Sequence, residues 1–337
     1  MKCLGIESTA HTFSIGIIDE EGNVLFDERL IYKPPLGQGI HPREAAQFHL
    51  ENATKVVKNA LNKVKIKDID AISFSQGPGL PNCLQVGASI ARFLSLKYKN
   101  PLIGVNHCVG HIEIGKLMTD CKDPVVVYCS GGNTQIIACV GGKYRIFGET
   151  TDIPIGNAFD VLARKLGLEM PGGPRIEELA KKGSWVDLPY VVKGMDLSFT
   201  GIVTQCKKLH NENVKKENIC YSFQETVFSM LTEVTERALA HTNKNEVLLV
   251  GGVAASQRLR EMMKVMCSGR EAKSYVVPSK YAADCGVNIA WMGVLLYKAG
   301  QKIINIDETK INYKWRTDDV EIKWIKPENN TRNDVFY

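Results

Sequence analysis

The sequence predicts an α/β fold built from two related halves. Each half opens with a strand, a polar turn, a second strand, a glycine-containing turn and a third strand, and then continues as alternating helices and strands. At 337 residues the chain is long enough for two lobes. Its 44% hydrophobic and 23% charged residues are typical of a globular protein and exclude a disordered or fibrous one. Similarity between the halves predicts two lobes that face a cleft.

The first half is expected over residues 1–120. Its elements, in order, are strands at 2–7, 13–19 and 24–32, a helix at about 41–64, a strand at 71–75, a glycine turn at 76–79, a helix that ends near 98, and a strand at 102–105. Leu50, Val57 and Leu61 recur at helical spacing in the first helix. The order predicts helices packed on a sheet that contains parallel strands.

The second half is expected over residues 121–311, after a short connection near 118–123. Its predicted elements are strands at 124–129, 134–140 and 144–147, several helices, a strand at 246–250 and a helix at 287–298. Residues 312–337 read as a polar, charged tail whose last ten residues are a candidate for disorder. Actin, hexokinase and Hsp70 have this duplicated plan and hold a nucleotide between their lobes.

Three glycine-rich segments in the second half favour a nucleotide site. They are Ser130-Gly131-Gly132-Asn133, Pro171-Gly172-Gly173-Pro174 and Gly251-Gly252-Val253-Ala254-Ala255-Ser256. Glycine lets backbone amides approach a phosphate closely, and the third segment follows a strand and opens a helix. A plain hairpin turn would explain the first segment equally well. Asp160 and Glu177, on the helices beside the second segment, are candidate acceptors for ribose hydroxyls, or else ordinary surface charges.

The histidine pair His107 and His111 predicts a metal site. Spacing of four residues puts both imidazoles on one helix face, where two ring nitrogens can bind one ion at about 2.0–2.1 Å. The pair follows a predicted strand, and α/β sheets place their sites at the carboxyl edge. Asp284, just before the helix at 287–298, is either a helix N-cap or a carboxylate that completes the site. The residues alone leave both interpretations open.

Cysteine use and charge bear on compartment and partners. The ten cysteines form no CxxC pair, and Cys3, Cys129 and Cys139 lie in apolar runs, so we expect buried, reduced thiols. Charged residues interrupt any apolar core of a signal peptide, and no 18-residue apolar stretch is present. We therefore expect a soluble intracellular protein. The net charge of +5 permits a polyanionic partner.

Motifs spread over about residues 4–321 resemble the Kae/TsaD/Qri family, the tRNA adenosine threonylcarbamoyltransferases. The shared motifs are Gly104-Val105-Asn106-His107-Cys108-Val109-Gly110-His111, Ser130-Gly131-Gly132-Asn133-Thr134-Gln135, Phe147-Gly148-Glu149-Thr150 and Gly251-Gly252-Val253-Ala254. Three further segments are similar to the archaeal and eukaryotic cytosolic branch: Tyr32-Lys33-Pro34-Pro35-Leu36-Gly37-Gln38-Gly39, Lys193-Gly194-Met195-Asp196-Leu197-Ser198-Phe199 and Arg316-Thr317-Asp318.

The resemblance implies a duplicated actin-like ATPase fold (ASKHA, ribonuclease H-like) and a reaction. The threonylcarbamoyl group of L-threonylcarbamoyl-adenylate is transferred to N6 of the adenosine 3′ of the anticodon (position 37) in tRNAs that read ANN codons, and AMP is released. It implies one iron or zinc ion held by His107, His111, Tyr128 and Asp284. The implied adenylate-binding residues, where ATP or ADP can also sit, are Tyr128, Cys129, Ser130, Gly131, Gly132, Asp160, Gly173, Glu177 and Ser256. No general base on the protein is implied.

The resemblance also implies partners and a place in the cell. The branch works in the KEOPS complex, with a small atypical kinase, a dimerising subunit and accessory proteins, in the cytoplasm and in some cases the nucleus, away from membranes. Two residues depart from the family pattern, which usually has Asn in place of Ser256 and Asp-Asn-Gly in place of Asp284-Cys285-Gly286. A shorter Ser256 puts its nucleotide contact in question, and Cys285 is a bystander or a redox-sensitive neighbour.

Three other functions compete. A zinc metalloprotease would need a glutamate after the first histidine, where Cys108 stands, so this reading is disfavoured. A sugar kinase or other ATPase of the same fold would use Mg²⁺ on acids and water, without a histidine pair. A noncatalytic nucleotide-binding scaffold is the third. The lysine runs at 55–67 and 207–216 are typical of solvated helix faces and identify no tRNA surface.

Overall fold

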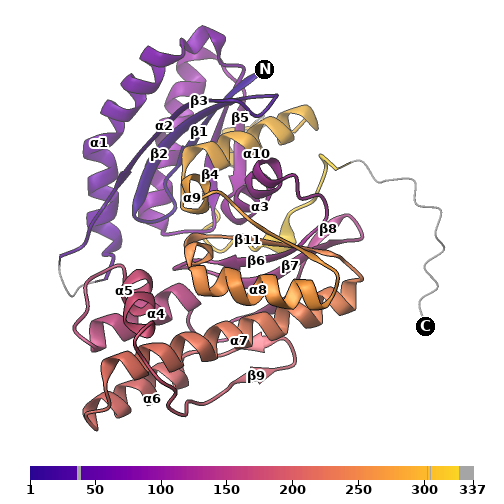
Figure 1. Cartoon of the computed structure of the whole chain (residues 1–337). Helices are drawn as coiled ribbons and strands as arrows, with labels where there is room; N and C mark the ends of the chain where they lie inside the picture. Colours follow the sequence, from indigo (N-terminus) through magenta and orange to yellow (C-terminus); the bar gives the residue numbers. More distant parts are fainter. Residues whose placement is uncertain (36–38, 302, 304, 326–337) are drawn as a thin grey trace.

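Two five-stranded sheets form the framework of the protein (Figure 1). The computed structural model describes residues 1–35, 39–301, 303 and 305–325. The first sheet has the order β3-β2-β1-β4-β5 and the second β8-β7-β6-β11-β12. Their strands are β1 Lys2–Glu7, β2 Thr12–Asp19, β3 Val24–Ile31, β4 Ala71–Gly77, β5 Leu102–Asn106, β6 Val125–Cys129, β7 Thr134–Val140, β8 Lys143–Glu149, β11 Glu246–Val250 and β12 Lys273–Val276.

The pairing in the two sheets confirms the predicted duplication. In each sheet the first three strands pair antiparallel, and the later two strands run parallel to the first. The actin-like plan predicted from the sequence is therefore present in the strand order itself. The predicted strands at 134–140 and 246–250 match β7 and β11 residue for residue, and the long predicted helix is α1, Pro42–Lys63.

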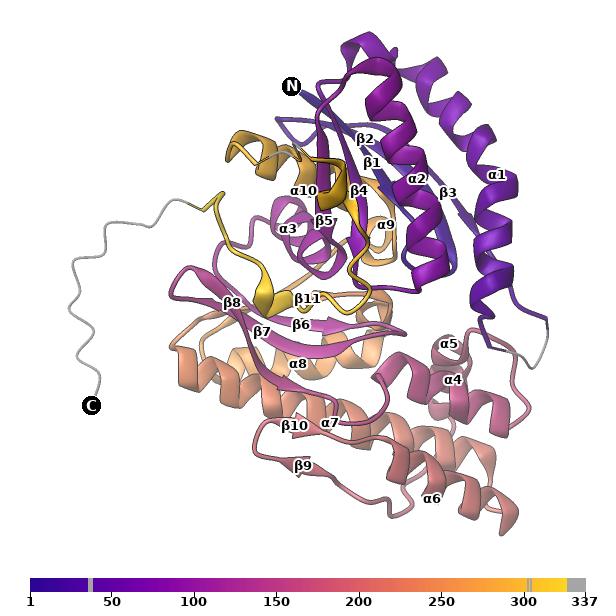
Figure 2. The ribbon, with the colours of Figure 1, turned by 180° about the vertical axis from the view of Figure 1, so that it is seen from behind.

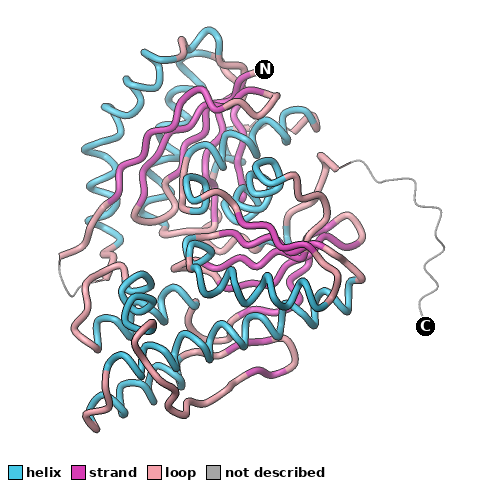
Figure 3. The backbone as a smooth tube through the Cα atoms, viewed as in Figure 1, coloured by secondary structure: helices cyan, strands magenta, loops and turns pink. Residues whose placement is uncertain are grey.

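Helices cover both faces of each sheet, as the tube in Figure 3 shows. Helices α1 and α2 (Pro81–Tyr98) lie on the outer face of the first sheet, and α7 (Lys216–Thr242) and α8 (Gln257–Gly269) on that of the second (Figure 2). Helices α3 (His107–Thr119) and α10 (Gly286–Lys298) lie between the sheets. The remaining elements are α4 Ile155–Lys165, α5 Gly172–Ala180, α6 Thr200–Asn211, α9 Ser279–Ala282, strands β9 Val192–Lys193 and β10 Asp196–Leu197, and four short 3-10 turns.

Strand β6 divides its side chains between two cores. Val125, Val127 and Cys129 pack into the outer core under α7, while Val126 and Tyr128 pack into the middle core beside α3 and α10. This is the two-residue alternation of a strand that is buried on both faces. It directs the Tyr128 ring into the layer that holds the histidine helix.

Helix α10 packs against the first sheet, although it follows the second sheet in the chain. A Cβ atom on Gly5 would lie 2.2 Å from the Ala290 backbone nitrogen, and one on Gly286 would lie 2.2 Å from the Gly16 nitrogen. Helix and sheet backbones therefore touch with no side chain between them. The packing fixes the start of α10, and with it the loop residue Asp284. The lobe limits at 120/121 and 311/312 stay a prediction.

The structure corrects one local prediction and leaves two outside its range. Gly172, Gly173 and Pro174 form the first turn of α5 rather than a turn before it, because Pro is tolerated where a helix has no partner for its N–H groups. The end of the tail and part of the 32–39 motif lie outside the described residues. All ten cysteines are free thiols; nine are buried and Cys139 is half-buried. Within the described part of the chain, no helix has the length and apolar character needed to span a bilayer.

Candidate metal centre and nucleotide site

Helix α3 begins directly where β5 ends, and this junction places both histidines. The Asn106 side chain caps the helix, with its Oδ1 accepting the Val109 backbone N–H at 3.2 Å. His107 is the first helical residue and His111 follows one turn later. Both are buried, and their ring centroids are 4.6 Å apart. The predicted helix face is therefore confirmed, and it faces the middle layer at the carboxyl edge of the first sheet.

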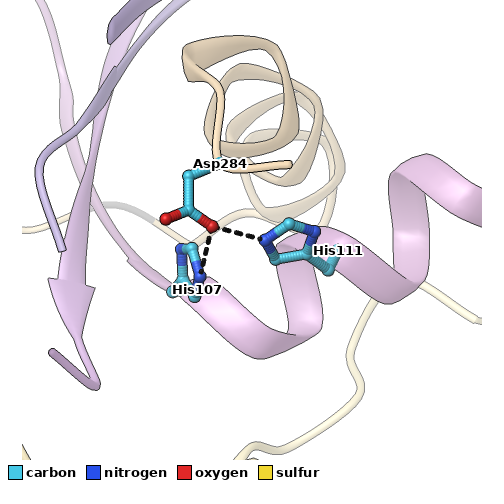
Figure 4. A group of neighbouring side chains, drawn as sticks. All are labelled: His107, His111 and Asp284. Carbon is cyan, nitrogen blue, oxygen red and sulfur yellow. Dashed lines mark hydrogen bonds and ion pairs between the residues drawn. The ribbon is translucent and has the colours of Figure 1, made fainter. Parts of the chain in front are cut away.

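Asp284 joins the two histidines from the far end of the chain. Its Oδ1 lies 3.4 Å from His107 Nε2 and 3.3 Å from His111 Nε2 (Figure 4). It stands on the loop between α9 and α10, and Cys285 rather than Asp284 is the N-cap of α10. The N-cap interpretation of Asp284 is therefore wrong, because the packing of α10 starts the helix one residue later and leaves this carboxylate to face the histidines.

The three side chains fit one metal ion. Their ligand atoms all lie within 4.8 Å of one another. A tetrahedral ion with bonds of about 2.0–2.1 Å holds two ligand atoms about 3.3–3.4 Å apart, which matches both measured separations. A charge-assisted hydrogen bond would be shorter, at about 2.7–2.9 Å. The donor set of two imidazoles and a carboxylate suits zinc or iron better than magnesium.

Tyr128, the penultimate residue of strand β6, lies beside this group. Its ring centroid is 5.4 Å from that of His111, and it is 1% exposed. Burial raises the pKa of Tyr128 well above its ordinary value, and the negative charge of Asp284 adds to the effect. The phenol therefore stays protonated unless a cation lies close to its oxygen.

The charges of the three side chains are strongly linked. Burial opposes the ionised form of Asp284, but the charge of His107 and hydrogen bonds to both histidines outweigh it, so the pKa of Asp284 falls well below its ordinary range. Burial likewise opposes protonation of His107, yet Glu7 and Asp284 raise the pKa of His107 well above its ordinary value. Burial lowers the pKa of His111. The site therefore already combines a carboxylate with a neutral imidazole.

Two further residues contact the histidine rings on the side that faces away from Asp284. Glu7, at the carboxyl end of β1, places its Oε2 2.8 Å from His107 Nδ1, and its Oε1 accepts the Thr9 backbone N–H at 2.6 Å. Asn288 on α10 places its Nδ2 3.2 Å from His111 Nδ1. Neither contact was predicted from the sequence. The available signal was an acidic residue at the end of an otherwise apolar first strand, at the same sheet edge as His107.

The segment Ser130–Asn133 is the hairpin turn between β6 and β7. The Ser130 N–H donates to the Asn133 carbonyl at 2.8 Å, and Ser130 Oγ accepts the N–H groups of Gly132 and Asn133 at 3.2 and 3.0 Å. Both glycines of the turn face open space, because no described atom lies within 4 Å of an added Cβ. The hairpin explanation is confirmed, and the open glycines leave room for a ligand beside it.

Two other glycines approach the backbone at the end of β6 and the start of this turn. A Cβ on Gly156, at the start of α4, would lie 2.6 Å from the Ser130 carbonyl, and one on Gly251 would lie 2.3 Å from the Cys129 carbonyl. The Cys129 side chain lies in the outer core, so only its backbone faces this group. Gly173 faces open space at the start of α5.

Asp160 and Glu177 both lie on helices, as predicted, and both bind backbone. Asp160 Oδ1 accepts the Gly172 N–H at 2.9 Å, and burial raises the pKa of Asp160. Glu177 Oε1 accepts the Ser256 hydroxyl at 3.1 Å and the Arg258 N–H at 3.0 Å. Each carboxylate therefore connects the start of one helix to its neighbour, and a contact of either with a nucleotide stays a prediction.

Comparison with known proteins gives consistent matches along the chain. The model of the TsaD family, described as tRNA N6-adenosine threonylcarbamoyltransferase, matches residues 23–291. A protein of that name from Archaeoglobus fulgidus is 53% identical over 325 residues, which cover 96% of this chain and 100% of the relative. A probable bifunctional tRNA threonylcarbamoyladenosine biosynthesis protein from Methanocaldococcus jannaschii is 56% identical over 327 residues. The match covers 97% of this chain but only 61% of that longer relative.

Solved structures show the fold alone. Full-length HypF in its phosphate- and nucleotide-bound form has a TM-score of 0.60 at 12% identity, with 88% of this chain and 56% of that chain covered. Component A of the (R)-2-hydroxyglutaryl-CoA dehydratase of Acidaminococcus fermentans has a TM-score of 0.54 at 13% identity, with 89% of this chain and 100% of that chain covered. Both are actin-like ATPase folds, in agreement with the duplicated sheets described above.

Proposed function

Because this chain belongs to the TsaD family of tRNA N6-adenosine threonylcarbamoyltransferases, we propose that it transfers the threonylcarbamoyl group of L-threonylcarbamoyl-adenylate to tRNA. The acceptor is N6 of the adenosine 3′ of the anticodon, position 37, in tRNAs that read codons beginning with A. AMP is the leaving product. The chain spans about three fifths of the length of the bifunctional relative from Methanocaldococcus jannaschii, 61% of that protein.

One observation supports the proposal above the others. His107, His111 and Asp284 lie in the same layer as the Tyr128 ring, and only Cys129 separates Tyr128 from the glycine-rich turn at Ser130–Asn133. A cation site and a candidate adenylate site are therefore joined by two residues of one strand. A reaction that breaks a bond between a phosphate and a carbonyl carbon needs these two sites side by side.

The proposed roles follow from this placement. A zinc or iron ion held by His107, His111, Asp284 and Tyr128 would polarise the carbamoyl carbonyl and neutralise phosphate charge. The Ser130–Gly132 turn, Gly173 and the Asp160 and Glu177 carboxylates hold the adenylate. AMP leaves readily, so orienting the N6 amine supplies much of the rate and no protein base is required.

The expected partners are inferred from the family resemblance. We expect tRNA as the acceptor and the KEOPS subunits as partners: a small atypical kinase, a dimerising subunit and accessory proteins. We expect the protein to act in the cytoplasm, and in a eukaryote also in the nucleus. ATP or ADP would occupy the adenylate site when the substrate is absent.

Reconstitution tests the proposal. The full chain, its partner subunits, L-threonylcarbamoyl-adenylate and tRNA are incubated, and the tRNA nucleosides are analysed by mass spectrometry. We expect threonylcarbamoyladenosine with the wild-type chain, none with His111→Ala, and a normal amount with His241→Gln, which changes an exposed histidine on α7. Normal modification by His111→Ala would place the catalytic site elsewhere, and transfer that proceeds equally well without this chain would indicate a noncatalytic scaffold. ATP hydrolysis without any modified nucleoside would indicate an ATPase or sugar kinase.

A further inference from the structure

Residues 308–321, which we call the strap, run from the first sheet to the second (Figure 2). At the end of β4 the Gln76 carbonyl accepts the Asn312 N–H at 2.8 Å, and the Gln76 side chain donates to the Lys310 carbonyl at 2.8 Å. A Cβ on Gly77 would lie 1.8 Å from the Asn312 carbonyl oxygen, so the two backbones touch. The first part of the strap is therefore held against the first sheet.

The later part of the strap binds the second sheet. Arg316 Nη2 lies 3.2 Å from Glu149 Oε1 at the end of β8, and Thr317 Oγ1 lies 3.3 Å from Gln135 Oε1 on β7. Gln135 Nε2 donates to Glu149 Oε2 at 3.2 Å. A carboxylate only accepts hydrogen bonds, so the amide presents its nitrogen to Glu149 and its oxygen to Thr317, whose hydroxyl donates. Thr317 is 1% exposed, so solvent does not compete for this hydroxyl.

Between these two parts the strap contacts the start of the histidine helix. Asn106, the N-cap of α3, accepts the Val109 N–H with its Oδ1. Its Nδ2 donates to the carbonyls of Trp315 and Arg316, each at 3.3 Å. Asn106 is 2% exposed and directly precedes His107 in the chain. One side-chain amide therefore joins the strap to the helix turn that presents the first histidine.

The partner of the strap on the second sheet lies next to Tyr128. Gln135 pairs directly with Tyr128 across β6 and β7. Directly opposed residues of two antiparallel strands point to the same face of the sheet, so both side chains face the middle layer. The side chain of Ile137, two residues further along β7, packs in that layer and agrees with this orientation. The strap therefore bonds the residue before His107 and the cross-strand neighbour of Tyr128.

These contacts lie at the edge where the two halves of the candidate site meet. The first sheet carries the histidine helix at the carboxyl ends of β4 and β5, and the second carries Tyr128 and the Ser130–Asn133 turn at the carboxyl end of β6. Transfer requires the two halves in register, because a misplacement of about 1 Å can cost about 100-fold in rate. Hydrogen bonds from one segment to both sheets restrict such a displacement.

We infer that the strap sets the spacing between the histidine helix and the strand that carries Tyr128, and that Arg316 and Thr317 are positioning residues for the transfer. The inference rests on the proposed function. It gives a role to the motif Arg316-Thr317-Asp318, which the reaction itself does not use. Arg316 holds the strap to β8 and Thr317 holds it to β7, while the backbone of the same segment is bonded to Asn106.

Distances between two spin labels on the full chain test the spacing. The labels are attached at Lys58→Cys on α1 and Lys264→Cys on α8, both exposed positions, in a Cys139→Ser background, because the other nine cysteines are buried. The test variant Arg316→Gln/Thr317→Val removes the charge and the hydroxyl. We expect it to broaden the distance distribution or to shift its mean.

Two matched variants serve as controls for the test variant. Arg316→Lys/Thr317→Ser keeps the charge and the hydroxyl and should give a distribution close to that of the wild type. Lys314→Gln removes an exposed charge of the same strap, which lies over the Tyr313 ring, and should have no effect.

Transfer kinetics with the partner subunits, tRNA and varied L-threonylcarbamoyl-adenylate test the positioning. The proposed adenylate-binding residues all belong to the second half of the chain, so the test variant should keep the KM for the adenylate. Its kcat should fall about 10- to 100-fold, because the histidine helix is no longer aligned with them. Near-UV circular dichroism gives the folded fraction by which each kcat is corrected. Both control variants should keep kcat and KM.

The outcomes separate this inference from the proposed function. An unchanged distance distribution in the test variant overturns the inference, and so does a broader distribution with an unchanged kcat. An equal loss of kcat in Lys314→Gln also overturns it, since the loss would then follow positive charge alone. If the wild-type chain with its partners modifies no tRNA, the proposed function fails, and the label distances still decide whether the strap sets the spacing. If the test variant does not fold, Thr317→Val alone, which keeps the side-chain shape, is measured in its place against Thr317→Ser.

Discussion

Glu177 on α5 accepts a hydrogen bond from the Ser256 hydroxyl at 3.1 Å, although 79 residues separate the two in the chain. Ser256 is also the N-cap of α8, where its Oγ accepts the Leu259 N–H at 3.4 Å. A serine at this position therefore connects the start of α8 to α5. The departure from the family's usual asparagine has a structural use, and it holds Glu177 at the end of the Gly251–Ser256 segment.

Replacing either acidic residue of the nucleotide group should weaken nucleotide binding. Charge-assisted hydrogen bonds contribute about 1.5–3 kcal/mol each, so we expect Asp160→Ala or Glu177→Ala to lower the affinity for ATP by roughly ten- to hundredfold. Isothermal titration calorimetry measures this. Glu178→Ala, which removes an exposed neighbour on the same helix, should have no effect. Unchanged affinity in both test variants would remove these residues from the site.

The histidine pair should be required for metal retention. We expect the double variant His107→Ala/His111→Ala to contain no stoichiometric zinc or iron by elemental analysis and to lose threonylcarbamoyl transfer. Tyr128→Phe should keep part of the metal, because a buried phenol is a weak ligand until a cation ionises it. The double variant should also have a lower thermal midpoint, because it leaves the buried Glu7 and half-buried Asp284 carboxylates without their histidine partners. Stoichiometric metal in the double variant would place the ion elsewhere.

Acid should destabilise the protein through His49 on α1. Burial lowers the pKa of His49 to about 4. The backbone of His11 and the negative charge of Glu7 raise this pKa in part, whereas the charge of the His11 side chain lowers it further. The folded pKa lies below the unfolded value of about 6.5, so the unfolded chain binds more protons between these values. The contribution of His49 to the free energy of unfolding should therefore be fully present above pH 6.5. It should fall by on the order of 2–3 kcal/mol as the pH drops to about 4.

Urea denaturation at several pH values measures this effect. His49→Leu removes the titrating group and should flatten the stability curve between pH 6.5 and 4. His41→Gln, an exposed histidine just before the same helix, should leave the curve unchanged. An equal acid loss in His49→Leu and the wild type would assign the pH dependence to other groups.

The backbone contact between α10 and the first sheet should tolerate no side chain. Gly5→Ala would place a methyl group 2.2 Å from the Ala290 nitrogen, so we expect a loss of at least about 3 kcal/mol in the free energy of unfolding, or no folded protein. Gly201→Ala on α6 meets no described atom within 4 Å and should be neutral or stabilising by up to about 1 kcal/mol. Denaturant titration compares the two. Equal stabilities would show that α10 can move away without cost.

Local sequence patterns were sufficient to predict most helices and strands and the two histidines of the metal site. Strand alternation, glycine turns and helical spacing act over a few residues, so the duplicated order of strands, helix α1 and the shared face of His107 and His111 could be predicted from the sequence. The same local view misread Gly172–Pro174 as a turn. A helix start and a turn use the same residues, and the packing of α5 against α4 and α7 decides between them.

The tertiary structure alone decided which distant side chains meet. Asp284 is 173 residues from His111, and Glu7 is 100 residues from His107. Both separations exceed anything that a local pattern encodes. They meet because α10 crosses back to the first sheet, and because β1 and β5 end at one edge of it. The sequence by itself determined which residues could bind a metal or a nucleotide, and backbone packing between the sheets decided which of them share a site.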